Sequence, residues 1–256
     1  MPFTFSHPAA IIPFLNKNRN YISATGLIIG SIAPDFESFI FLNEKKIYGH
    51  TWPGVFWFDL PLAILLAIVY HVVVRDALIK NLPWVLYERL QRFEGINWMK
   101  YFKKHFFVVI ISMLIGIFSH LLLDAFTHLN LLDPDATDSP IYLGHVQVYL
   151  LLQYTLSVVG LILAAYYILK IPAVPVQKSG HNQMTFRISC VKHSRTTKIT
   201  YWVLVMIFTC LTMITAIYFL EREMNIILFI DISIAGACSA LIIVPLVQKL
   251  IIPASH

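Results

Sequence analysis

Charged residues are scarce in this chain of 256 residues, and their scarcity excludes an ordinary soluble domain. Asp, Glu, Lys and Arg together account for 13% of the sequence, whereas 58% of it is hydrophobic. A typical soluble domain contains about 25% charged residues. The mean hydropathy is +0.71, and several apolar runs reach about 20 residues, the length that crosses a bilayer as a helix. The sequence therefore predicts an all-α polytopic membrane helical bundle.

The three cysteines are too few and too scattered for a disulfide framework. Cys190 lies in a polar stretch, while Cys210 and Cys238 lie inside apolar runs. This distribution also argues against a zinc site built from thiolates. A Gly-rich phosphate-binding loop and the G-x-S-x-G turn of serine hydrolases are both missing from the sequence.

Membrane-spanning helices are expected wherever the apolar runs are long enough. The predicted spans are residues 54–74, 105–128, 146–170, 200–220 and 226–247. Ahead of them, Pro8–Asn16 and Tyr21–Pro34 flank a short polar turn, a pattern typical of a helical hairpin. The first arm is too short to cross a bilayer at about 1.5 Å per residue. A sixth span over residues 21–42 is the alternative, and it would bury Asp35 and Glu37 in mid-bilayer.

The formal charge of +5 is concentrated in two stretches. The expected loop 75–104 and the linker 171–199 are rich in Lys and Arg, whereas the expected loop 129–145 contains neither. By the positive-inside rule the two basic stretches are cytoplasmic and 129–145 is outside. The charge thus points to topology in a cell inner (plasma) membrane rather than to a nucleic-acid partner. The sequence does not indicate an oligomeric state.

Polar residues interrupt the second predicted span at a regular interval. His120, Asp124 and His128 lie four residues apart, so they share one helix face with a drift of about 40° per step. Ionisable side chains are costly to place in hydrocarbon, and an intramembrane group of them suggests a functional site. The structural alternative is a polar contact between helices, or, for His128, a helix-end cap.

Other polar residues are expected at the same membrane face. His7 opens the hairpin and Asp35 closes it, so an antiparallel arrangement lets them meet. His50 precedes the first span, which runs inward, and His120 lies near the outer end of the second, which runs outward. The predicted topology therefore brings His7, Asp35, His50, His120 and Asp124 to the extracytoplasmic side.

Imidazoles and carboxylates are ligands for divalent transition metals. Zn²⁺ is the first choice, with Mn²⁺ and Fe²⁺ also compatible. His120 and His128 are about 12 Å apart along a helix, so they cannot both bind one ion. Either one of them lies outside the coordination shell, or Asp124 bridges two ions. Glu37 and His128 are the candidate catalytic general base or acid.

The motifs MPFTFSHPAA, GSIAPDFESF, GHTWPG and SHLLLDAFTH resemble those of a bacterial membrane-protein family, domain-of-unknown-function family 4184. Their order is similar to that of inner-membrane metal-dependent hydrolases and, more remotely, of zinc-dependent phospholipase C. The resemblance covers about residues 1–165. It implies His7, Asp35, His50, His120 and Asp124 as site residues, with His128 and Gln153 as additions.

Three parts and one leading function follow. Residues 1–170 are expected to form a metal-site membrane domain, 171–199 a basic cytoplasmic linker, and 200–256 a C-terminal hairpin of two spans. The leading function is metal-dependent hydrolysis of a phosphoester or lipid-like substrate at the membrane interface. The alternatives are a metal-handling or transport protein and a non-enzymatic membrane scaffold.

Overall fold

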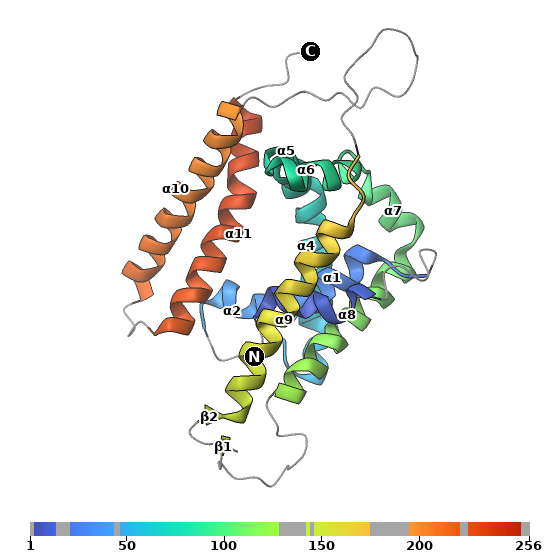
Figure 1. Ribbon diagram of the computed structural model, residues 1–256, viewed down its shortest axis with the longest axis vertical. Helices are drawn as coiled ribbons and strands as arrows, with labels where there is room; N and C mark the ends of the chain where they lie inside the picture. The colour runs from blue at the N-terminus through green and yellow to red at the C-terminus, as the bar shows by residue number, and fades with distance from the viewer. Residues whose placement is uncertain are drawn as a thin grey trace. The chain divides into compact units, whose positions relative to one another are not determined.

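A computed structural model describes residues 3–13, 21–43, 47–127, 142–143, 146–174, 195–220 and 225–251. It confirms the predicted fold class, a helical multi-pass membrane protein (Figure 1). The helices long and apolar enough to cross a bilayer are Ala24–Phe41, Trp52–Asn81, Phe106–Ala125, Leu150–Lys170, Thr196–Leu220 and Ile226–Leu250. Five of these correspond to the predicted spans, and Ala24–Phe41 is the segment left open as a sixth.

The first part of the chain contains short helical pieces, which follow one another without a break over Ala24–Phe41 and over Trp52–Asn81. They are η1 (Thr4–Ala10), α1 (Ala24–Ile32), η3 (Ala33–Asp35), α2 (Phe36–Phe41), α3 (Trp52–Gly54), η4 (Val55–Asp59), α4 (Leu60–Val69), η5 (Tyr70–Val74) and α5 (Arg75–Asn81). The first hairpin arm differs from the expectation, because it begins at Thr4 and is a 3₁₀ helix that contains Pro8. Proline lacks the N–H that a continuous α-helix requires.

The remaining elements include the longest helices. They are α6 (Trp84–Leu90), η6 (Gln91–Phe93), α7 (Trp98–Lys104), α8 (Phe106–Thr127), β1 (Tyr142–Leu143), β2 (Val146–Gln147), α9 (Val148–Lys170), α10 (Arg195–Leu220) and α11 (Ile226–Ile251). The strands form one antiparallel pair, with Tyr142 opposite Gln147. Residues 75–104, expected as a loop, are instead largely helical, since α5, α6 and α7 lie within them.

The chain forms two compact units. Unit 1 comprises residues 1–68 and 97–167, and unit 2 comprises 69–96 and 168–256. The division of the chain at residues 170 and 199 stays a prediction. In unit 2, the N–H of Val174 donates to the carbonyl of Glu88 at 2.8 Å, so the start of the predicted linker is bound to α6.

In unit 1, α1 and α8 pack together through glycines (Figure 1). A Cβ at Gly26 would lie 2.8 Å from the carbonyl oxygen of Val109, and one at Gly116 would lie 2.8 Å from the amide nitrogen of Ser31. Gly30 faces the backbone of Met113 in the same way. Small residues allow helix backbones to approach closely in membranes. This close approach determines which α1 groups face the polar end of α8.

An apolar cluster supports the packing of α8 in unit 1. Its buried members are Ile29, Ala33, Ala63, Ala67, Trp98, Val109 and Met113. They come from α1, η3, α4, α7 and α8, so the cluster ties the first predicted span to the second. The polar residues of the site lie beyond this cluster, toward the C-terminal end of α8.

In unit 2, α10 and α11 lie side by side (Figure 1). Their apolar cluster consists of Tyr201, Val205, Ala240 and Val244. Gly236 allows close approach here too, because a Cβ at that position would lie 2.6 Å from Thr212 Oγ1. The nearest atom in this case belongs to a side chain, and the carbonyl oxygen of Thr209 would lie 3.1 Å away.

Candidate metal centre

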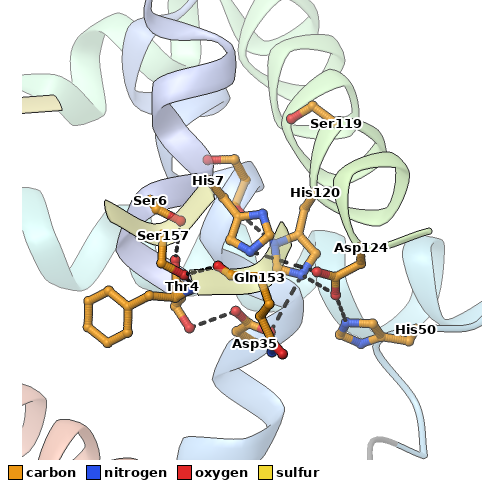
Figure 2. A network of polar contacts seen from close by, with 12 residues as sticks. Thr4, Ser6, His7, Asp35, His50, Ser119, His120, Asp124, Gln153 and Ser157 are labelled. Carbon is orange, nitrogen blue, oxygen red and sulfur yellow. Dashed lines mark hydrogen bonds and ion pairs between the residues drawn. The ribbon is translucent and has the colours of Figure 1, made fainter. Parts of the chain in front are cut away.

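Four side chains of unit 1 present metal-ligating atoms to a common point (Figure 2). One ligand atom from each of Asp35, His50, His120 and Asp124 lies within 4.8 Å of the other three. Asp35 ends η3, His50 precedes α3, and His120 and Asp124 lie one turn apart on α8. Segments separated by up to 89 positions in the sequence therefore meet at one place. They include four of the five residues predicted as ligands.

The separations between these atoms are those of ligands around one ion. His50 Nε2 lies 3.3 Å from Asp124 Oδ2. His120 Nε2 lies 3.5 Å from both Asp35 Oδ1 and Asp124 Oδ2. A tetrahedron with bonds of about 2.0–2.1 Å to zinc has edges of about 3.3–3.4 Å. The three separations of 3.3–3.5 Å are close to this value, and an ion would draw the other atoms of the group, which lie within 4.8 Å of one another, closer together.

The orientation of His120 is set by the backbone of α1. Its Nδ1 lies 2.8 Å from the carbonyl oxygen of Ser31. A carbonyl only accepts, so Nδ1 carries the proton and Nε2 keeps its lone pair for the centre. Metal-binding histidines in proteins commonly donate their other N–H in this way. Among the residues that the structure describes, His120 Nε2 has no hydrogen-bond partner, although it is fully buried.

Asp35 is oriented by a residue of η1. The hydroxyl of Thr4 donates to Asp35 Oδ2 at 2.6 Å, and both side chains are buried. This bond leaves Asp35 Oδ1 directed toward His120. It also joins the start of the first hairpin arm to the end of the second, as the antiparallel arrangement requires.

His7 lies against the group of four without joining it. Its ring stacks on that of His120, with centroids 4.0 Å apart. Its Nε2 lies 3.9 Å from Asp124 Oδ1, the oxygen that does not face His50 and His120. The two oxygens of Asp124 therefore face different histidines. The role of His7 as a ligand stays a prediction.

Of the two candidate catalytic residues, the structure describes only Glu37. His128 lies outside the described residues. Glu37 is buried, but its carboxylate accepts hydrogen bonds from the N–H groups of Ile47, Tyr48 and Gly49 and is not part of the group of four. Its role as a general base stays a prediction.

The sequence alone did not identify two of the supporting groups, Thr4 and the carbonyl of Ser31. Thr4 lies one turn before His7 on η1, and the small-residue pattern Gly26-x-x-x-Gly30 precedes Ser31 directly. These signals were present, but a backbone carbonyl has no sequence signature of its own. Gln153 of α9 belongs to the same polar network, where Ser157 Oγ donates to its carbonyl oxygen at 2.7 Å (Figure 2).

The residues present fit a divalent ion. Two imidazoles and two carboxylates form a donor set that suits Zn²⁺, Mn²⁺ or Fe²⁺. Asp35 and Asp124 are both buried, with 4% of each residue exposed. Two buried anions repel each other and lose hydration. An ion of charge +2 would cancel their charge and provide a partner for His120 Nε2.

Comparison with known proteins supplies a family. The model of the family described as "Domain of unknown function (DUF4184)" matches residues 1–248. The match extends through α10 and most of α11, so the expected limit near residue 165 was wrong. No curated protein and no solved structure matches the chain. The similarities to inner-membrane hydrolases and to zinc-dependent phospholipase C find no support in these comparisons.

Proposed function

Because the chain belongs to the DUF4184 family, whose description assigns no activity, we propose a function from the chemistry of unit 1. Asp35, His50, His120 and Asp124 bind a divalent metal ion, Zn²⁺ by first choice. The protein is a metal-dependent hydrolase that acts at the membrane interface on a phosphoester or lipid-like substrate. The observation that carries the proposal is the set of three separations of 3.3–3.5 Å between ligand atoms, two of which bring Asp35 and His50 from other segments to the α8 residues His120 and Asp124.

Two imidazoles and two carboxylates around a divalent ion suit hydrolysis better than a purely structural role. When bound, a divalent ion polarises the scissile group and makes water a stronger nucleophile near neutral pH. The donor set contains no thiolate, which a closed structural zinc site commonly has. Asp35 and Asp124 would hold the ion, while His128, four residues after Asp124 in the sequence, is the proposed general acid or base.

Access to the centre is easiest beside His50. Its side chain is 19% exposed, whereas the side chain of Asp124 is 6% exposed and that of His120 is 0% exposed. Two residues further along the chain, the exposed ring of Trp52 packs on Phe118 of α8, with centroids 5.8 Å apart. Aromatic residues are enriched at membrane–water interfaces. A substrate with an apolar tail and an ester head group suits this surrounding.

Metal analysis of the full-length protein tests the proposal first. Wild-type protein purified in detergent should retain zinc in a stoichiometric ratio, and His120→Ala should not. His71→Ala is the matched control, because His71 is a histidine of unit 2 that contacts Arg75 Nη1 at 2.9 Å. Two zinc ions per protein molecule would favour the version of the site in which Asp124 bridges two ions. Because His7 faces Asp124 Oδ1, His7→Ala should then remove one of the two ions. Metal-free wild-type protein would exclude the proposal and favour a scaffold.

Hydrolysis is tested with defined probes. Bis(p-nitrophenyl) phosphate, p-nitrophenyl butyrate and a fluorescent phospholipid in vesicles represent a soluble phosphodiester, a carboxylic ester and a lipid. Activity on at least one probe should disappear with a chelator and return with Zn²⁺. Bound metal without hydrolysis, together with metal flux in vesicles, would instead identify a metal-handling protein.

The proposed side of the membrane is extracytoplasmic. Thr51 is exposed beside His50, so Thr51→Cys in a background without Cys190, Cys210 and Cys238 gives a labelling site. A membrane-impermeant maleimide should label it in intact cells. Labelling only after the membrane is opened would place the centre on the cytoplasmic side.

A further inference from the structure

The carboxylate of Glu37 holds the loop that carries His50. Oε1 accepts from the N–H of Ile47 at 2.7 Å and of Tyr48 at 2.9 Å. Oε2 accepts from the N–H of Gly49 at 2.6 Å. Bonds from backbone amides to an ionised carboxylate are stronger than bonds between neutral groups. Three successive amides of the loop are therefore attached to one buried side chain.

Gly49 allows this attachment because it has no side chain. A Cβ at Gly49 would lie 2.8 Å from Asp59 Oδ1, 3.1 Å from Glu37 Oε2 and 3.1 Å from the carbonyl oxygen of Pro34. The loop backbone thus passes between two buried carboxylates and the backbone of η3. Any larger residue would push the loop away from this position.

His50 follows directly and is held from its other side as well. Thr51 caps α3, since its Oγ1 accepts from the N–H of Gly54 at 3.1 Å and donates to the carbonyl of Tyr48 at 2.8 Å. The backbone of His50 therefore lies between the residues bound to Glu37 and a helix cap. This leaves the imidazole little freedom other than rotation about its own side-chain bonds, and it ends 3.3 Å from Asp124 Oδ2.

We infer that Glu37 is a positioning residue for metal binding, which acts on the centre through His50. The inference rests on the proposed function and deepens it. Residues 35–37 then serve the centre twice: Asp35 supplies a ligand, and Glu37, two positions later, fixes the loop that supplies another. Both oxygens of Glu37 are engaged by the loop, which is the arrangement of a structural anchor rather than of a group free to accept a proton from water.

A double-mutant cycle on the full-length protein tests this pathway, with Co²⁺ as the probe. Tetrahedral Co²⁺ has a visible spectrum that reports the ligand set and allows titration. Glu37→Gln should weaken Co²⁺ binding by about 10–100-fold, the range for residues that orient metal ligands. Its spectrum should resemble that of His50→Ala. The double variant should bind no more weakly than His50→Ala, because Glu37 has no further route to the ion.

Two further variants guard against misfolding as an explanation. Gly49→Ala displaces the same loop while residue 37 remains a glutamate, and it should also give no additional loss of Co²⁺ affinity in a His50→Ala background. Glu37→Asp keeps the charge and should recover part of the affinity. Glu88→Gln on α6 of unit 2 is the matched control and should bind Co²⁺ as wild type does.

The outcomes separate the two proposals. Additive losses in the cycle, or wild-type affinity in Glu37→Gln, would overturn the positioning role and leave the metal site intact. A wild-type protein that binds neither Co²⁺ nor Zn²⁺ would overturn both. If Glu37→Gln instead lowers the rate of hydrolysis and changes its pH profile, with Co²⁺ binding unchanged, Glu37 would be assigned to catalysis.

Discussion

α8 in unit 1 and α10 in unit 2 are similarly apolar, but they bury different side chains. The buried residues of α8 include Ser112, His120 and Asp124. Those of α10 in the described chain are Tyr201 and Val205. Average hydropathy thus identifies both as candidate spans, and it does not show that α8 buries ionisable side chains at the candidate metal centre while the buried residues described in α10 are Tyr201 and Val205.

One buried basic side chain in each unit, Arg75 and His120, allows a comparison of how such a group is satisfied. In unit 2, Arg75 is 3% exposed and bonds to Asp76 Oδ1 at 2.6 Å and to the carbonyl of Ile96 at 2.9 Å. These are hydrogen bonds that need no further partner. In unit 1, His120 Nε2 faces two carboxylates at 3.5 Å, a spacing too long for a good hydrogen bond. Arg75 is thus satisfied by hydrogen bonds within the protein, whereas the arrangement of His120 with Asp35 and Asp124 suits an added cation.

The largest expected effect comes from breaking the ligand set of unit 1. Asp124 Oδ2 is close to both His50 and His120. Asp124→Asn replaces an anionic ligand by a neutral amide and should weaken zinc binding by more than about 100-fold, beyond the range for outer-shell residues. Elemental analysis checks this on protein that elutes as wild type does in size-exclusion chromatography. Asp76→Asn in unit 2 should keep its zinc, and stoichiometric zinc in Asp124→Asn would contradict the ligand assignment.

The glycine contacts of the two units allow a second comparison. Gly116→Ala should destabilise the protein by about 1–3 kcal/mol, as overpacking does, because the added methyl group meets the backbone of Leu27 and Ser31. It should also weaken zinc binding by moving Ser31 away from His120. Thermal unfolding in detergent and zinc titration measure the two effects.

Gly236→Ala is the control for that comparison. Its added methyl group would lie 2.6 Å from Thr212 Oγ1 and 3.1 Å from the carbonyl oxygen of Thr209, whereas at Gly116 the nearest backbone atom is only 2.4 Å away. A smaller loss of stability and unchanged zinc binding are therefore expected. Equal zinc affinities in the two variants would show that α1–α8 packing does not position the centre.

A smaller effect is expected from Thr4→Val. The change keeps the side-chain shape but removes the hydroxyl that donates to Asp35 Oδ2. Zinc affinity should fall by about tenfold, the lower end of the range for a group that orients a ligand. Thr212→Val in unit 2 removes a hydroxyl that donates to the carbonyl of Phe208 and should leave affinity unchanged. Competition with a chromophoric chelator measures both, and identical values would remove Thr4 from the site.

The smallest effect is expected from Tyr201→Phe in unit 2. The hydroxyl of Tyr201 is buried and has no hydrogen-bond partner in the part of the chain that the structure describes. Its removal should change the free energy of unfolding by less than about 0.5 kcal/mol or stabilise the protein slightly. Zinc binding should not change. A loss above 1 kcal/mol in thermal unfolding would mean that the hydroxyl has a partner after all.

Much of the fold could be read from the sequence because lipid imposes a simple rule. A helix satisfies its own backbone, so an apolar run of sufficient length predicts a span without knowledge of its neighbours. The runs at 54–74 and 226–247 are observed as Trp52–Asn81 and Ile226–Leu250. The helical continuation through Arg75 was missed, because the basic residues there are compatible with either a loop or a helix whose polar groups are satisfied.

The sequence by itself determined five of the spans, the family and the shared face of His120 and Asp124 on one helix, and it left Ala24–Phe41 open. Only the tertiary structure decided that Asp35 and His50 face them while His7 stacks behind and Glu37 holds the loop. The physical reason is that helical periodicity specifies a face but not the partner opposite it. That partner depends on where Gly26, Gly30 and Gly116 let two backbones touch, and such a contact is a property of the pair of helices.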